Sequence, residues 1–244
     1  DRLEVNLNYK NFLRGKFLYG DKSSEGFVIL GEGSYPLELV QNKFFVSGSL
    51  KKLDLSQYIS FSSEYTLPLD KELFFIKNLK VKEMQLGSMV LKETLIDMER
   101  ADKSFKFFLI SEALKGIVLF PDSKKQEISV DLDYLKLNDL DQSPEIFFRS
   151  VMQNMKVPVL FSVHSLEVDK ELFGSWKFNL SSTQRQMTFK DIEGNYGRWR
   201  VGKIGDKTNS RLTLNKNSKG WTTNLNTSLF SDSPNKAFDD LSLE

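Results

Sequence analysis

Apolar and polar residues alternate along much of this chain with a period of two. The pattern begins at residues 3–9, where Leu3, Val5 and Leu7 are interleaved with polar residues, and it returns at residues 174–180 and 221–229. Successive side chains of a β-strand point to opposite faces, so this period predicts strands with one face in water and one face dry.

Clusters of glycine, proline, asparagine and aspartate divide the chain into about 14 predicted strands. The clearer ones are residues 3–9, 12–19, 26–30, 44–50, 73–81, 88–98, 104–110, 127–137, 159–168, 174–180, 186–193, 197–204, 211–216 and 221–230. Links that are short favour antiparallel neighbours, because parallel pairing needs long crossovers. Residues 54–59 and 144–155 are the two segments in which we expect short helices.

The composition supports a β-protein and excludes several other classes. Phenylalanine occurs 20 times, whereas alanine, the best helix former, occurs only at Ala101, Ala113 and Ala237. The net charge is +1 and no basic stripe stands out, which argues against a nucleic-acid-binding protein. The chain has no cysteine, which excludes disulfides, thiolate metal sites and cysteine nucleophiles.

Length and hydropathy bear on the number of domains and on location. A chain of 244 residues can form one large β domain or two smaller ones. No apolar run reaches the roughly 18 to 20 residues that a membrane span needs. The chain begins at Asp1 with neither an initiator methionine nor a signal peptide, so we expect a mature or excised segment whose membrane anchor lies outside it.

The search for chemistry finds no catalytic constellation. His164, the only histidine, falls on the polar side of its predicted strand, so we interpret it as solvated. The segment from Gly31 to Gly33 lacks the later glycine and the helix of a phosphate loop, which favours a plain turn. Glu127 and Glu193 are the carboxylates that a glycosidase could pair, although sequence cannot fix their separation.

Two other clusters have ordinary structural explanations. The carboxylates Asp131, Asp133, Asp139 and Asp141 lack the central glycine of a calcium loop, and the first two share one strand face that we expect to be solvated. Around Trp199, alternation predicts the ring inside and Arg198 and Arg200 outside. The sequence therefore predicts no enzyme, no metal site and no cofactor.

The remaining signal is the apolar side of the strands, which we take as the candidate binding surface. Its residues are Phe107, Leu109, Ile128, Val130, Leu132, Phe161, Val163, Trp176, Phe178, Leu180, Met187, Phe189, Trp199, Val201, Leu212, Leu214, Leu225 and Leu229. Each costs roughly 1.5–3 kcal/mol if it is left in water, so the face must be covered. A second sheet would make a closed β-sandwich, which composition alone favours; a bound lipid would make an open, curved sheet.

One pattern of residues occurs twice, 87 residues apart. Leu79-Lys80-Val81, Leu86-Gly87-Ser88 and Leu91 are matched by Leu166-Glu167-Val168, Phe173-Gly174-Ser175 and Phe178. We interpret each copy as a strand, a tight turn opened by glycine and a return strand. Such units are typical of arrays that grow by adding strands.

The order of several short motifs resembles that of the AsmA-like proteins, most closely the YhdP branch of that family. The motifs are Gly26 to Gly31, Pro36, Phe45 to Tyr58 with its Leu53-Asp54-Leu55 segment, Val157-Pro158, Leu166-Glu167-Val168, Phe173-Gly174 and Gly194 to Arg200. The likeness covers most of residues 26–230.

This resemblance implies a long, curved antiparallel β-sheet whose apolar groove carries phospholipid acyl chains across the periplasm of Gram-negative bacteria. It further implies an N-terminal helix outside this chain that anchors the protein in the inner membrane, and partners at the inner and outer membranes. We expect one continuous groove segment over residues 1–244, with the best candidate for an internal boundary at 138–158. The alternative is a β-sandwich binding or structural module of the cell envelope without lipid transport.

Overall fold

The structure is a computed structural model in which the described residues form strands, turns and connecting loops. It describes residues 2–10, 12–20, 23–34, 39–54, 74–86, 89–121, 126–137, 157–183, 185–202, 210–217 and 220–233. Within these ranges there is no helix, and hence none with the length and apolarity that a bilayer crossing requires. The chain divides into two compact units, Asp1–Glu112 and Ala113–Glu244.

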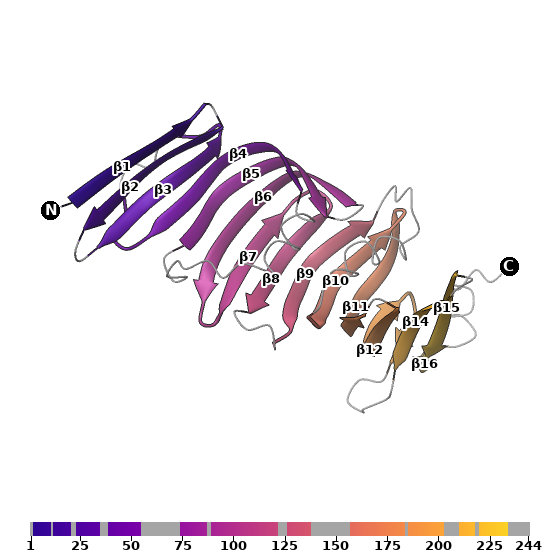
Figure 1. The fold of residues 1–244 in the computed structure, drawn as a ribbon. Helices are drawn as coiled ribbons and strands as arrows, with labels where there is room; N and C mark the ends of the chain where they lie inside the picture. The colour runs from indigo at the N-terminus through magenta and orange to yellow at the C-terminus, as the bar shows by residue number, and fades with distance from the viewer. Residues whose placement is uncertain are drawn as a thin grey trace. The chain divides into compact units, whose positions relative to one another are not determined.

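Unit 1 is an open sheet in which the strands lie in chain order (Figure 1). Its strands are β1 (Arg2–Tyr9), β2 (Leu13–Gly20), β3 (Ser24–Gly31), β4 (Phe44–Asp54), β5 (Phe74–Leu86), β6 (Met89–Ala101) and β7 (Ser104–Ile110). The long strands β4, β5 and β6 bend along their length (Figure 1).

Unit 2 is also an open sheet, with one branch at its β12 strand. Its strands are β8 (Leu114–Pro121), β9 (Ile128–Leu137), β10 (Val159–Val168), β11 (Glu171–Ser182), β12 (Gln186–Tyr196), β13 (Trp199–Val201), β14 (Arg211–Asn217), β15 (Gly220–Asn226) and β16 (Leu229–Phe230). One end of β12 pairs with β14 and then β15, and the other end pairs with β13 and then β16.

The expected all-β fold with an open, curved sheet is confirmed, whereas the closed β-sandwich is wrong for the described residues, because neither unit contains a second sheet. The sheets are mixed rather than wholly antiparallel: β3 with β4, β4 with β5, and β9 with β10 are parallel pairs. Their connections, residues 32–43, 55–73 and 138–158, are long enough for the crossover that parallel pairing needs.

Most predicted strands are present. Of the strand predicted at 197–204, only Trp199–Val201 is strand among the described residues, since residues 197 and 198 form a turn. Strand β8 was not among the predictions because its Ile117 to Phe120 run is continuously apolar and shows no alternation. The predicted strand at 221–230 is two strands, β15 and β16. Of the helix predicted at 54–59, only Asp54 is described, and it is the last residue of β4. The helix predicted at 144–155 lies outside the described residues. Most of the boundary predicted at 138–158 lies outside them as well.

The repeated turn is wrong in its second copy. Gly174 lies inside β11, and the hairpin between β10 and β11 turns at Asp169 and Lys170. Both turn residues have positive φ, 49° and 71°, which is the backbone of a two-residue type I′ turn. In the first copy, Gly87 lies outside the described residues.

Pairs of polar residues interrupt the alternation of the long strands at matching levels. In β5 the pair Lys82-Glu83 separates Val81 from Met84, and in β6 the pair Lys92-Glu93 separates Leu91 from Thr94; the four flanking residues are buried and the pairs are exposed. Val81 pairs with Thr94 and Met84 with Leu91, so the two breaks face each other.

The same break extends into β4, where Lys51 and Lys52 are exposed between Leu50 and Leu53. The cross-strand order at this level is Lys52, Glu83, Lys92, in which opposite charges are neighbours and so favour this register. Residues three apart lie on opposite faces of a regular strand, so keeping the flanking residues on one side needs an irregular backbone near the break, such as the left-handed Glu93 in β6.

Glycines let aromatic rings approach across strands. In unit 1, Phe17 pairs with Gly26 and Gly26 pairs with Phe44. The Phe17 and Phe44 ring centroids lie 6.0 Å apart, and those of Phe44 and Phe74 lie 5.8 Å apart. A Cβ atom at Gly26 would lie 2.7 Å from Cδ1 of Phe17, so this row of rings needs a glycine in β3.

The break in β6 generates a stability prediction, because Glu93 has a φ of 47°. Asparagine tolerates this left-handed conformation and β-branched residues do not. We therefore expect Glu93→Val to lower the free energy of unfolding by about 1–2 kcal/mol, and Glu93→Asn to preserve or raise it. Urea unfolding followed by circular dichroism measures both.

The neighbouring Lys92, which is exposed and has ordinary strand backbone, supplies the control: Lys92→Val should change stability by less than about 0.5 kcal/mol. Equal losses for valine at 92 and 93 would contradict the role of the left-handed backbone.

Candidate functional site: the apolar face of the strands

The register of unit 2 places the predicted apolar residues on one face. Phe161 of β10 pairs with Val130 of β9 and with Phe178 of β11. Farther along, Leu180 pairs with Phe189. Directly opposed residues share a face, so these strands together form one surface, which we call the apolar face of unit 2.

The same face continues onto the last strands. The two β14 leucines extend it, since Leu214 pairs with Met187 and Leu212 pairs with Phe189 and, on its other side, with Leu225. Along the other branch of β12, Val201 pairs with Gly194 and with Leu229. Phe107 and Leu109 belong to β7 of unit 1, where they pair with Met98 and Ile96 of β6, and both are half-buried.

Burial divides the predicted residues into three groups. Those that are buried are Ile128, Leu132, Phe161, Val163, Phe178, Leu180, Met187, Phe189, Trp199 and Leu214. Those that are half-buried are Phe107, Leu109, Val130, Trp176, Val201 and Leu212. The exposed ones are Leu225, at 60%, and Leu229, at 52%. A ligand thus has direct access to the face at Leu225 of β15 and Leu229 of β16, while most of the predicted residues of β9 to β12 are already packed against protein.

Sequence reasoning missed residues that lie beyond the breaks in alternation. Leu135 and Leu137 of β9 are buried and pair with Leu166 and Val168 of β10, continuing the face after the polar pairs at 133–134 and 164–165. Ile192 is buried beyond the Lys190-Asp191 pair of β12 in the same way. The signal for these residues in the sequence was a pair of polar residues that separates apolar ones and recurs in neighbouring strands.

Most of the apolar face of unit 1 was also missed, since only Phe107 and Leu109 of the predicted residues belong to it. Its most enclosed part is formed by β5 and β6, whereas the edge strand β1 exposes Leu3 at 63% and Leu7 at 44%. Leu3 pairs with Tyr19, which is also exposed, and Val5 pairs with Phe17. The alternation of Leu3, Val5 and Leu7 is the signal in the sequence for this part of the face.

Trp176 closes a gap in the apolar face of unit 2. Its partner across the strands is Gly194, and a Cβ atom there would lie 2.5 Å from Cε3 of the indole. The indole Nε1 donates a hydrogen bond of 2.7 Å to the carbonyl oxygen of Phe173, which fixes the ring over the glycine. The row Trp176, Gly194, Val201, Leu229 is therefore apolar throughout.

The lone histidine is solvated, as expected. Its side chain is 70% exposed, and its Nε2 lies 3.5 Å from Oδ1 of Asp131. The same carboxylate oxygen accepts a hydrogen bond of 2.5 Å from Oγ of Ser162. The serine hydroxyl therefore faces Asp131 rather than the imidazole, an order that does not match serine activation by histidine.

The other predicted polar features also lie at the surface. Asp131 and Asp133 are both exposed, and Asp133 lies 3.0 Å from Nζ of Lys115, whose pKa is raised by that hydrogen bond and negative charge. The described residues contain no group of three or more histidines and carboxylates that could hold a metal ion. Asp139 and Asp141 lie outside the described residues.

The prediction for the Arg198–Arg200 segment is confirmed: Trp199 is 7% exposed and both arginines point outward. Arg200 is not a free cation, because its Nη2 lies 2.6 Å from both carboxylate oxygens of Asp232. This pairing leaves little of its charge for a glycan or a lipid headgroup.

Compared with known proteins, the chain matches no family model, no curated protein and no solved structure. The resemblance to the AsmA-like proteins therefore stays a prediction based on the order of the motifs.

Gly194 generates a test of the Trp176 contact. Gly194→Ala should displace the indole and lower the free energy of unfolding by about 1–3 kcal/mol, as overpacking does. Chemical unfolding and tryptophan fluorescence measure the two effects. Gly20→Ala is the matched control at another strand glycine. There the new methyl group meets only the flexible Arg2 side chain at 3.3 Å and the Ser23 carbonyl oxygen at 3.4 Å. A loss of unfolding free energy in Gly20→Ala as large as that in Gly194→Ala would argue against the Trp176 contact.

The difference in burial along the face predicts different costs of truncation. Leu180→Ala, at a fully buried position, should cost about 2–5 kcal/mol. Leu225→Ala, at an exposed position of the same face, should change the free energy of unfolding by less than about 0.5 kcal/mol. Urea unfolding compares the two variants directly, and similar losses would show that the end of the face is covered as its middle is.

Proposed function

We propose that this chain is a segment of a lipid-transfer protein that carries phospholipid between the inner and outer membranes of a Gram-negative envelope, with acyl chains held on its apolar face. The observation that carries the proposal is the apolar face of unit 2, which runs from strand to strand and becomes accessible at Leu212, Leu225 and Leu229. The ordered AsmA-like motifs support the same function.

The energetics favour an apolar ligand at the accessible end. Burying a methylene group gains about 0.8 kcal/mol, so a few carbons of an acyl chain against Val201, Leu225 and Leu229 offset the cost of ordering that chain. A polar ligand would gain nothing from these side chains. Acyl chains fit the surface in chemistry, and no covalent step is required of the protein.

The mechanism is passive. Acyl chains lie along the apolar side chains while the polar headgroups remain in water, and net movement follows the difference in lipid free energy between the two membranes. The buried middle of the face, around Val163 and Leu180, holds the strands in place rather than contacting lipid directly.

Photo-crosslinking tests the proposal with one reactive residue at a time in the full chain. A benzophenone side chain at Val201 or Leu225, on the apolar face, should capture phospholipid in cells several-fold more than one at Lys177 or Thr222, which are exposed polar positions of β11 and β15. Mass spectrometry of the adducts identifies the lipid.

Equal capture at the two pairs of positions, or capture of protein but no lipid at Val201 and Leu225, would overturn the lipid-carrying proposal. The second result would make the exposed end of the face a protein-docking surface of an envelope module. Thermal melts of the four labelled proteins check that each is folded.

A further inference from the structure

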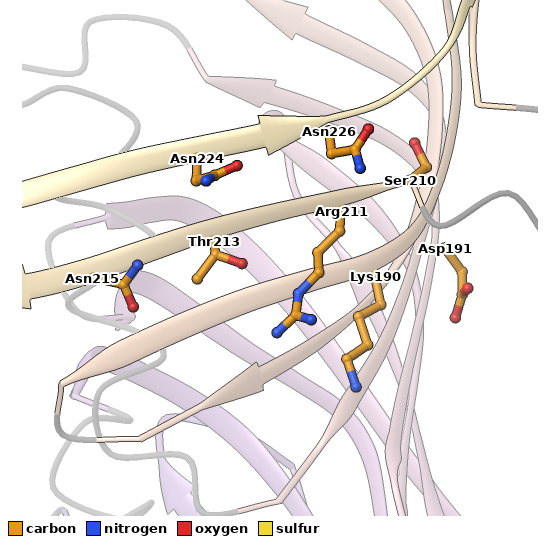
Figure 2. A pocket seen from close by; sticks show the side chains of 8 residues that line it. All are labelled: Lys190, Asp191, Ser210, Arg211, Thr213, Asn215, Asn224 and Asn226. Carbon is orange, nitrogen blue, oxygen red and sulfur yellow. The ribbon is translucent and has the colours of Figure 1, made fainter.

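The polar side of the last strands of unit 2 contains a hollow of ≈ 620 Å³ (Figure 2). It lies over β12, β14 and β15, whose alternate residues form the apolar face described above. Its lining consists of asparagine amides, hydroxyls, two cations and one carboxylate. Its volume is in the range of sites that hold small ligands.

The two cations of the hollow are direct neighbours. Lys190 of β12 pairs with Arg211 of β14, which in turn pairs with Asn226 of β15. In Figure 2 the Lys190 and Arg211 side chains extend from adjacent strands in the same direction. Like charges directly opposed across strands are destabilising, so this arrangement costs the protein stability unless something compensates it.

Nothing in the described part of the chain neutralises this pair. Neither Lys190 nor Arg211 forms an ion pair or a side-chain hydrogen bond there, in contrast to Lys115 and Arg200, which have carboxylate partners. Asp191 accepts a hydrogen bond of 2.9 Å from Nδ2 of Asn179, and Figure 2 places its carboxylate on the side of Lys190 away from Arg211.

Uncharged hydrogen-bonding groups surround the two cations. Asn226 lies in the same cross-strand row, and Thr213 and Asn224 form the next row. An asparagine amide both donates and accepts hydrogen bonds, which suits the hydroxyl groups of a polyol. No side-chain hydrogen bond occupies Thr213, Asn224 or Asn226 among the described residues.

We propose that this hollow binds a phosphorylated sugar or polyol, with the phosphate between Lys190 and Arg211 and the hydroxyls on the amides of Asn224 and Asn226. The planar guanidinium matches two phosphate oxygens, and the ammonium adds a second charge-assisted hydrogen bond. The ligand would supply the negative charge that the described protein does not place beside the pair.

The site does not depend on the proposed lipid function, since it lies on the other face of the same strands. The ligand chemistry has two sources: a free sugar phosphate, or the glycerophosphate headgroup of a lipid such as phosphatidylglycerol. Both present one phosphate and adjacent hydroxyls.

Calorimetric titration of the full chain with glucose 6-phosphate, inorganic phosphate and glucose tests the soluble source. Sedimentation with phosphatidylcholine vesicles, with and without phosphatidylglycerol, tests the lipid source. We expect binding in at least one arm, weakened roughly tenfold or more by Arg211→Gln or Lys190→Gln, because a charge-assisted contact is lost. Lys216→Gln is the matched control, since Lys216 is on β14 but at the alternate position, on the other face.

Thermal melting is a second measurement, which separates a loss of ligand binding from a loss of folding. Without ligand, Arg211→Gln should melt at or above the wild-type temperature, because it removes a like-charge pair from an exposed surface. Ligand should then raise the melting temperature of the wild type and of Lys216→Gln but not that of Arg211→Gln.

Three results would overturn the proposal: no binding in either arm, binding that Arg211→Gln and Lys216→Gln weaken equally, or inorganic phosphate binding as tightly as glucose 6-phosphate. The last would remove the role of the amides in holding hydroxyls. None of these results bears on acyl-chain capture at Val201 or Leu225, so this proposal and the lipid proposal fail separately.

Discussion

The structure depends on keeping apolar side chains on one side of long, bending strands. Residues two apart share a face of a regular strand, so an extra residue turns the apolar residues that follow it to the other face unless the backbone is irregular there. The chain meets this constraint with matched polar pairs, as at Lys82-Glu83 and Lys92-Glu93, and with left-handed residues such as Glu93 and Asp191. Between β5 and β6 and between β9 and β10 the breaks lie at the same level and the register does not change there. Between β10 and β11 and between β11 and β12 only one strand is broken, and the register shifts at that point.

One consequence is that the burial of the apolar side chains varies along the face. Where long strands meet, as between β5 and β6 or between β10 and β11, the side chains exclude water almost completely. At the edge strand β1 and at the β15 and β16 strands, the same face loses neighbours, and leucines are left exposed. Exposure of an apolar face at such strands is energetically unfavourable, so a partner or ligand of matching chemistry is expected there.

The two faces of β12, β14 and β15 have different chemistry because their residues alternate. Leu212 and Leu214 point to the apolar face, while Arg211, Thr213 and Asn215 line the polar hollow. The proposed acyl-chain surface and the proposed phosphate site therefore lie on opposite sides of the same strands. A substitution on one face can be read out without directly altering the other.

Alternation in the sequence determined most of the strand content, though not β8, and it determined the polar positions of Asp131 and His164 and the inward position of Trp199. It could do so because a period of two depends only on local backbone geometry. It did not determine the parallel pairs or the face beyond each break, such as Leu135 and Ile192. The parallel pairs and the continuation of the face depend on which strands become neighbours. The same holds for the burial of Val163, the exposure of Leu225 and the pairing of Lys190 with Arg211. Only the tertiary structure decided them, because residues distant in the chain must be brought into register before one covers another.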